Sequence, residues 1–133
     1  MGILNKVFGR SKESDEPEIE TINTNLYKVN TAAFEQEVVQ SDMPVVVDCY
    51  TNSCPPCKKM GPIFEKLAGE YEGRVKFVKV DLDRSKAIGR TYKVRGVPTL
   101  FMFKDGVVQE SLIGLNKEDT IKEALDDLFG NKK

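Results

Sequence analysis

The sequence predicts an α/β fold in which helices flank a central mixed β-sheet. From about residue 26 onward, short β-branched runs alternate with longer stretches of helical spacing. The segment 44–50, PVVVDCY, is apolar on both faces, as a central strand covered by helices should be. Near the C-terminus two strands follow each other without a helix between them, so parallel and antiparallel pairing are combined in one sheet.

The first strand and the first helix are adjacent in the chain. LYKV at 26–29 predicts a strand. Asn30 is placed to cap a helix, because its side-chain oxygen can accept hydrogen bonds from the free N–H groups of the first turn. The helix is expected to end before Met43. Its buried side is formed by Phe34, Val38 and Val39.

A second helix is expected at 55–71, directly after the strand 44–50. It begins at proline, whose missing N–H costs nothing at the first helical position. Gly73 ends it, and RVKFVKVD at 74–81 predicts the next strand. A short helix follows at 85–94, and its cap is expected from Asp83 or Ser85.

A hairpin and a helix complete the chain. Residues 99–114 predict two antiparallel strands with a turn at Asp105 and Gly106. The last helix is expected to start at Asn116 and to turn one apolar face inward. That face is formed by Ile121, Ala124, Leu125 and Leu128.

Residues 1–24 are expected to form a flexible tail ahead of one domain at 25–133. The stretch GRSKESDEPEIETINTN is charged and polar, with too little apolar surface to offset the entropy of ordering. Residues 1–8, MGILNKVF, could instead form a short helix whose apolar face docks on a membrane or a partner. So short a helix is marginal in isolation, which favours the tail.

Length and composition limit the class of protein. With 133 residues, 40% of them hydrophobic, the chain suits one domain. Its 20 basic and 21 acidic residues give no net field that would attract nucleic acid or an anionic membrane. No apolar run would span a bilayer or serve as a secretory signal, and three cysteines do not match a secreted disulfide framework. We expect a cytoplasmic monomer without a transmembrane segment that binds no nucleic acid.

Cys54 and Cys57 stand one helical turn apart at the start of the helix predicted at 55–71. Such a pair can be a redox couple, part of a metal site, a structural disulfide or a coincidence. Free backbone N–H groups and the helix dipole favour the thiolate of Cys54, which makes it the candidate nucleophile. Cys57 is close enough to form a disulfide with it. Pro55 and Pro56 fix a rigid turn around the pair, which favours the redox reading.

A metal site is disfavoured by the small number of ligands. The chain has no histidine, and its third thiol, Cys49, lies inside the strand 44–50. We expect Cys49 to be a small core residue, and no metal or other cofactor besides the cysteine pair. Two subunits could still pool four thiolates around an iron–sulfur cluster, and this alternative stays open.

Asp48 interrupts the apolar strand. Strand alternation places it on one face with Tyr50, and because both faces are covered we expect its carboxyl group to be buried. Burial raises the pKa of a carboxyl group and is costly unless the group is used or paired. Asp48 is therefore a candidate proton acceptor and donor for Cys57, the more interior thiol. If the strand ended at Val47, Asp48 would be solvated instead.

The chain from about 26 to 129 resembles the thioredoxin family. The segments VVVDCYTNSCPPCKKMGP, FVKVDLD and VRGVPTLFMFKDG, with the later Gly114, fall in the family's order and spacing, which is far more specific than a lone CxxC. The resemblance implies a three-layer thioredoxin-like fold and reduction of protein disulfides through a mixed disulfide with the client protein. A thioredoxin reductase would supply the electrons. Lys79 would be the charged neighbour of the buried Asp48.

The resemblance also implies a groove for the client. Val97 and Pro98 would form a cis-proline loop facing Cys54, with the Val97 backbone pairing to an extended client segment. Gly96 and Gly114 would keep the groove shallow.

Three positions depart from the family pattern. Pro55 replaces the usual glycine after the first cysteine, while Ser53 and Tyr50 stand where tryptophans are usual. The groove therefore loses an aromatic wall. Pro55 also removes an N–H near Cys54, which should make the dithiol more reducing.

Two other functions remain as alternatives. A thiol oxidant or isomerase would keep the fold, but such relatives usually carry histidine between the cysteines, and this chain has none. A non-catalytic module would use the pair to bind a partner or an iron–sulfur cluster. The colour and iron content of the purified protein would identify the cluster.

Overall fold

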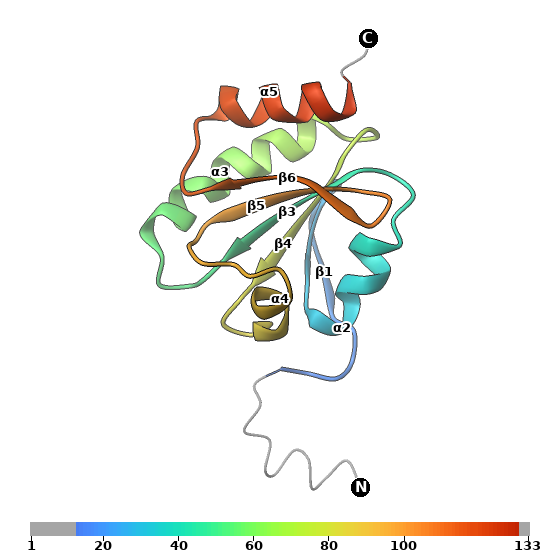
Figure 1. The fold of residues 1–133 in the computed structure, drawn as a ribbon, viewed down its shortest axis with the longest axis vertical. Helices are drawn as coiled ribbons and strands as arrows, with labels where there is room; N and C mark the ends of the chain where they lie inside the picture. The colour runs from blue at the N-terminus through green and yellow to red at the C-terminus, as the bar shows by residue number, and fades with distance from the viewer. Residues whose placement is uncertain (1–12, 131–133) are drawn as a thin grey trace, which may run out of the picture.

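A computed structural model describes residues 13–130. Its centre is a six-stranded mixed sheet with the strand order β1-β2-β4-β3-β5-β6 (Figure 1). The strands are β1 (Ile19–Asn23), β2 (Leu26–Val29), β3 (Val45–Tyr50), β4 (Lys76–Asp81), β5 (Thr99–Lys104) and β6 (Val107–Ile113). The helices are α2 (Thr31–Phe34), the π-helix η1 (Glu35–Val39), α3 (Pro55–Glu70), α4 (Lys86–Thr91) and α5 (Glu118–Phe129).

The sheet combines both kinds of pairing, as the sequence predicts. β4 lies parallel to β2 and β3, whereas β5 pairs antiparallel with β3 and with β6. In this register Asp48 is opposite Lys79 on β4 and Leu100 on β5. The middle of β3 is therefore enclosed by strands on both sides.

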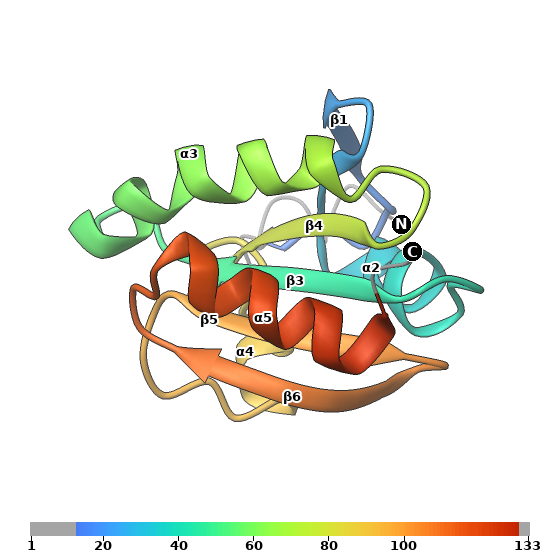
Figure 2. The ribbon, with the colours of Figure 1, turned by 90° about the horizontal axis from the view of Figure 1, so that it is seen from above.

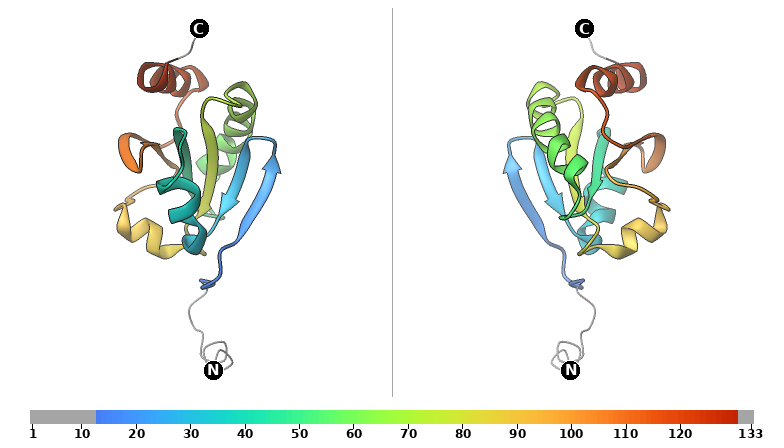
Figure 3. Two further views of the ribbon diagram at one scale, coloured as in Figure 1. Left: turned by 90° about the vertical axis from the view of Figure 1, so that its right-hand side faces the viewer. Right: turned by 90° about the vertical axis from the view of Figure 1, so that its left-hand side faces the viewer.

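Helices cover the sheet from both sides, which gives three layers (Figure 3). α3 and α5 lie side by side on one face (Figure 2). The core below them includes Val46, Met60, Phe64, Phe77, Ile121 and Leu125. α2, η1 and α4 cover the other face. The core on that side includes Val45, Val47, Cys49, Phe34, Ile88 and Phe103.

The tail predicted for residues 1–24 is wrong at Ile19–Asn23. These residues form β1, an edge strand that pairs antiparallel with β2. β1 is mostly exposed and has no apolar alternation, so its sequence gives no strand signal. The helix predicted for residues 1–8 lies outside the described residues.

The helix ends agree with the sequence in part. Asn30 caps α2 by accepting a hydrogen bond from the Ala33 N–H, as expected. Ser85 occupies the N-cap position of α4 without a side-chain hydrogen bond. Instead, the Ala87 N–H in the first turn donates to a carboxylate oxygen of Glu13, 3.3 Å away. The start predicted at Asn116 is too early, since α5 begins at Glu118.

Candidate active site

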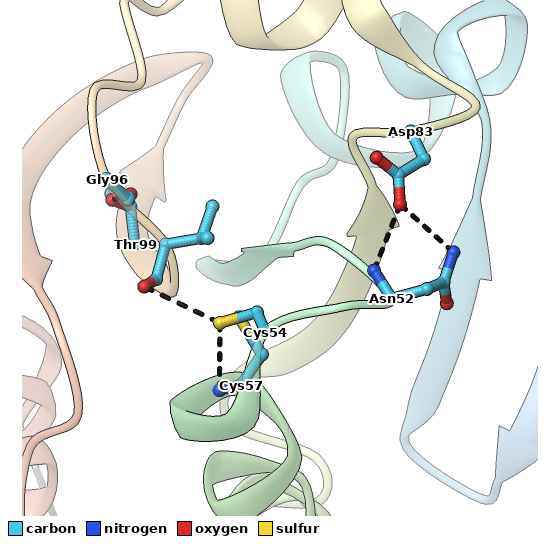
Figure 4. The surroundings of a disulfide bond; sticks show 7 residues. Asn52, Cys54, Cys57, Asp83, Gly96 and Thr99 are labelled. Atoms are coloured by element: carbon cyan, nitrogen blue, oxygen red, sulfur yellow. Dashed lines mark hydrogen bonds between the residues drawn. A yellow bond between two sulfur atoms is a disulfide. The ribbon is translucent and has the colours of Figure 1, made fainter.

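The two cysteines of the CPPC motif are joined in a disulfide at the start of α3 (Figure 4). Cys54 is the N-cap residue, and Cys57 lies in the first turn. The Cys57 backbone N–H donates a hydrogen bond to Cys54 Sγ over 3.1 Å. A donor at this position favours the thiolate of Cys54 once the disulfide is reduced. That Cys54 is the activated sulfur stays a prediction.

The loop before β5 faces the disulfide. The Val97–Pro98 peptide bond is cis, and the Val97 carbonyl oxygen lies 3.7 Å from Cys54 Sγ. The Thr99 hydroxyl donates to the Gly96 carbonyl over 2.6 Å and closes the loop from inside. The Gly114 N–H donates to the Pro98 carbonyl over 2.7 Å, which ties the end of β6 to the same loop. The structure thus brings Gly96, Val97, Pro98 and Gly114 together beside Cys54.

Gly114 has a backbone conformation that requires glycine. Its φ is +88°, which side chains rarely adopt, although a Cβ there would meet no atom within 4 Å. Its neighbours Ile113 and Leu115 are exposed, with 69% and 45% of their surface accessible. An apolar surface therefore borders the disulfide on this side. Whether Gly96 and Gly114 keep the groove shallow for a client stays a prediction.

Asp48 is buried, as strand alternation predicts. Only 1% of its surface is exposed, and neither carboxylate oxygen has a hydrogen-bond partner among the described residues. Burial raises the pKa of Asp48 from 3.8 to about 7, and the nearby Lys79 ammonium lowers it by a smaller amount. Asp48 can therefore gain or lose a proton near neutral pH. It lies on the sheet face that α3 covers, the same face as Val46.

Lys79 and Tyr50 form the polar edge of this buried site. Lys79 lies opposite Asp48 in the register of β3 and β4, and its Nζ is 4.7 Å from the centre of the Tyr50 ring. That distance allows a cation–π contact. Burial also raises the pKa of the Tyr50 hydroxyl, which keeps it neutral near pH 7. Lys79 thus contacts the Tyr50 ring and acts on Asp48 through its charge.

Cys49 lies on the opposite face of β3. Its side chain is completely buried in the core under α2 and α4. Burial raises the pKa of its thiol strongly, which suppresses the reactive thiolate. The structure thus supports the expectation that Cys49 is a core residue. Ser53, Pro55 and Pro56 are exposed around the disulfide.

Sequence reasoning missed a polar clamp formed by Asn52, Asp81 and Asp83. Figure 4 shows the hydrogen bonds between Asn52 and Asp83. The Asn52 side-chain amide donates to Asp81 Oδ2 over 3.0 Å and to Asp83 Oδ2 over 3.3 Å. The Asn52 backbone N–H donates to the same Asp83 oxygen over 3.0 Å. In turn, the Asp83 N–H donates to Asp81 Oδ1 over 2.9 Å. The clamp fixes the loop that ends at Cys54 against the loop after β4.

A signal for the clamp was present in the sequence. Asp81 ends one predicted strand and Asp83 follows it, while Asn52 follows another. Carboxyl ends of neighbouring parallel strands meet at one edge of a sheet, so these polar residues could have been grouped. The clamp also explains why Asp83 does not cap α4. Its carboxylate accepts hydrogen bonds from Asn52 instead.

Within residues 13–130, no three histidine, cysteine, aspartate or glutamate side chains gather where they could hold a metal ion. None of the helices in the described part of the chain is long and apolar enough to cross a membrane.

Comparison with known proteins gives a consistent result. The Thioredoxin family model matches residues 25–127. Thioredoxin of Pseudomonas aeruginosa is 35% identical over 105 residues, which cover 79% of this chain and 97% of that protein. Thioredoxin 1 of Nostoc sp. is 35% identical over 99 residues, and thioredoxin 1 of Synechococcus elongatus 37% over 98. Each of these two matches covers 74% of this chain and 92% of the relative. β1 lies before the matched region.

Proposed function

Because the chain belongs to the thioredoxin family and reduces protein disulfides through its CPPC dithiol, we propose that Cys54 attacks the client disulfide and that Cys57 completes the reaction. The observation that carries this order is the hydrogen bond from the Cys57 N–H to Cys54 Sγ. It stabilises negative charge on Cys54 alone. Cys54 also lies next to the Val97 carbonyl, where an extended client backbone would pair.

The reaction then has two exchange steps. The Cys54 thiolate forms a bond to one client sulfur while the client S–S bond breaks, and the second client sulfur leaves and takes a proton. The Cys57 thiolate then attacks Cys54 in this mixed disulfide. The Cys54–Cys57 disulfide forms and the first client sulfur leaves as a thiol. Two electrons pass from the dithiol to the client disulfide.

Asp48 is the proposed proton acceptor for Cys57. With a pKa of about 7, its carboxyl group is partly ionised at neutral pH and has no competing hydrogen bond among the described residues. A base with a pKa near the working pH is effective because it can both accept and return a proton. Lys79 would limit how far the pKa of Asp48 rises.

The remaining partners follow from this chemistry. The dithiol needs no further cofactor for exchange, but it must be reduced again after each turnover. We propose a thioredoxin reductase or an equivalent dithiol donor as the electron source. The three cysteines, which do not match a secreted disulfide framework, and the similarity to bacterial thioredoxins favour a monomer that works in the cytoplasm.

A trapping experiment tests the order of attack. Cys57→Ser should accumulate a covalent complex with disulfide-containing clients, because Cys54 still attacks but no thiol resolves the product. Turnover of insulin disulfides, driven by dithiothreitol, should be lost. The complex would be detected as a band that disappears on reduction and would be identified by mass spectrometry.

The matched control is Cys54→Ser, which keeps Cys57 and should trap nothing. Equal trapping by both variants, or trapping by Cys54→Ser alone, would contradict the assignment. Circular dichroism of each variant would verify that the fold is retained.

A further inference from the structure

We propose that a basic hollow beside the disulfide docks acidic segments of client proteins. The hollow lies between α4 and the loop that leads to Val97. It has a volume of about 550 Å³ and is lined by four cationic side chains, Lys86, Arg90, Lys93 and Arg95. This inference rests on the proposed function, because it adds a preference among clients to the same dithiol reaction.

The lining of the hollow suits a peptide that carries both acidic and apolar side chains. Its lining includes the side chains of Leu82 and Val94, which give an apolar floor. Gly89 also lines the hollow and lies next to the Leu82 side chain. The cations stand around this floor. A segment with carboxylates and one apolar side chain is complementary to such a surface.

The four cations have no ion-pair partner within the described part of the chain. Among residues 13–130, none of them forms a salt bridge, since the three pairs found there involve Lys66, Lys76 and Lys122. The stretch 84–98 contains five basic and no acidic residues, and the stretch 49–64 contains two basic and no acidic residues. The whole chain has a net charge of −1. These two stretches carry only basic charges in a slightly acidic protein, although Asp81 and Asp83 flank the lining residue Leu82.

Acidic residues are concentrated in the N-terminal segment, which reaches the first turn of α4 through Glu13. Five of the eight residues at 13–20 are acidic, and none of these eight lines the hollow. Like charges placed together repel one another, so the basic surface is maintained at some cost to the free protein. An acidic client would remove this repulsion.

Lys93 supplies an independent indication. It follows the C-cap residue of α4, where glycine is the usual choice, and it has a left-handed backbone with a φ of 54°. A lysine in that conformation is strained relative to glycine. Strained residues persist mainly where their side chain is used. The strain at Lys93 coincides with the rim of the hollow.

The hollow is held at a fixed position relative to Cys54. The Leu82 N–H donates to the Tyr50 carbonyl over 2.8 Å, and the flanking residues Asp81 and Asp83 bind Asn52. On the other side, Arg95 precedes Val97 by two residues, and the Val97 carbonyl contacts Cys54. A client segment paired with Val97 would therefore pass directly beside the cations.

The experiment compares two synthetic disulfide peptides that differ only in four residues flanking the client disulfide, glutamate in one and glutamine in the other. The pre-reduced protein is mixed with each peptide, and kcat/KM for disulfide reduction is measured. We expect the glutamate peptide to react about three- to tenfold faster at low ionic strength. The preference should vanish at about 1 M salt, where the screening length falls to about 3 Å.

Charge-removing variants test whether the hollow produces the preference for the glutamate peptide. Lys93→Gly removes one charge and relieves the strained backbone, so it should lower the ratio of the two rates while stability stays the same or rises. Lys86→Gln combined with Arg90→Gln should lower the ratio further. The matched control is Lys104→Gln, which removes an exposed charge at the far end of β5 and should leave the ratio as in the wild type.

A failure of the docking proposal can be distinguished from a failure of the proposed function. Equal rates for both peptides at low ionic strength would overturn the docking proposal and leave the reductase intact. A preference that Lys104→Gln lowers as much as Lys93→Gly would also overturn it, because net charge would then be responsible. If the wild type reduced neither peptide, the proposed function itself would fail.

Discussion

The buried carboxyl group of Asp48 makes the stability of the fold depend on pH. Both of its carboxylate oxygens are buried without a hydrogen-bond partner among the described residues. Its pKa is about 7 in the folded protein, against 3.8 for an ordinary aspartate. The folded state therefore binds the proton more tightly than the unfolded chain. The contribution of Asp48 to stability is therefore greatest below about pH 4 and falls as the pH rises from 3.8 to about 7, so ionisation of Asp48 weakens the fold.

Asp48→Asn should stabilise the protein while slowing its chemistry. The pKa difference between 3.8 and about 7, at about 1.36 kcal/mol per unit, gives a gain of up to about 4 kcal/mol at pH 8. The gain should vanish below about pH 4, where both side chains are neutral. Urea unfolding of the oxidised proteins across this pH range measures it.

The same variant should reduce insulin about ten- to a hundredfold more slowly near pH 7, because Cys57 has lost its proton acceptor. The gap should close above about pH 9, where the thiol ionises without help. A variant that is both slower and less stable at pH 8 would contradict the assignment. So would an unchanged pH profile, because Asp48 would then be a structural residue.

Single residues differed in how well the sequence predicted them. The burial of Asp48 followed from strand alternation alone, because apolar neighbours continue past it. The clamp at Asn52 was missed, although its polar residues stand at the carboxyl ends of two predicted strands, because the sequence shows no contact between them. The contact between Glu13 and the Ala87 N–H joins residues 74 positions apart and gives no local pattern.

The clamp joins two loops at one end of the sheet, and its value can be measured there. Asn52→Ala should lower the free energy of unfolding by about 1–3 kcal/mol, because Asp81 is buried and loses a donor. Asn52→Asp keeps the size but brings a third carboxylate next to Asp81 and Asp83. It should therefore cost more than alanine at pH 7, and the difference should disappear at about pH 3, where carboxyl groups are protonated.

Both variants should also slow insulin reduction, since the clamp holds the loop that ends at Cys54. Denaturant unfolding and the insulin assay are the two measurements. If Asn52→Asp were as stable as the wild type at pH 7, the carboxylates would not be held together in solution. The clamp would then have no role.

At the scale of elements, the sequence predicted those whose apolar residues are periodic. The strands β2 to β6 and the helices α3 to α5 lie where the apolar patterns predict them, although α5 begins two residues after the predicted start at Asn116. The first helix has its predicted cap at Asn30 but continues as a π-helix from Glu35, which depends on tertiary packing that no local pattern records. β1 was missed because an exposed edge strand needs no buried face.

At the scale of the whole molecule, the chain combines the family domain with an N-terminal addition. The family model begins at residue 25, whereas β1 and the segment before it are joined to the domain by specific contacts. Asn30 Oδ1 accepts from the Glu18 N–H over 2.9 Å and from the Ala33 N–H over 3.1 Å. The addition thus shares a capping residue with α2. β1 also covers the backbone edge of β2, which would otherwise be free to pair with another chain.

Removal of residues 1–24 should leave a folded and active reductase of lower stability. The core and the disulfide site lie within residues 25–130, so insulin reduction should stay within about twofold of the full chain. Loss of β1 removes a few backbone hydrogen bonds, each worth about 0.5–1.5 kcal/mol, against the entropy regained by its residues, for a net loss of about 1–3 kcal/mol. The exposed edge of β2 should also increase self-association at high concentration, as measured by light scattering.

The matched control removes only residues 1–12 and keeps both β1 and Glu13. If that control lost as much stability, β1 would not be responsible, and a folded but inactive 25–133 chain would place part of the active site in the addition.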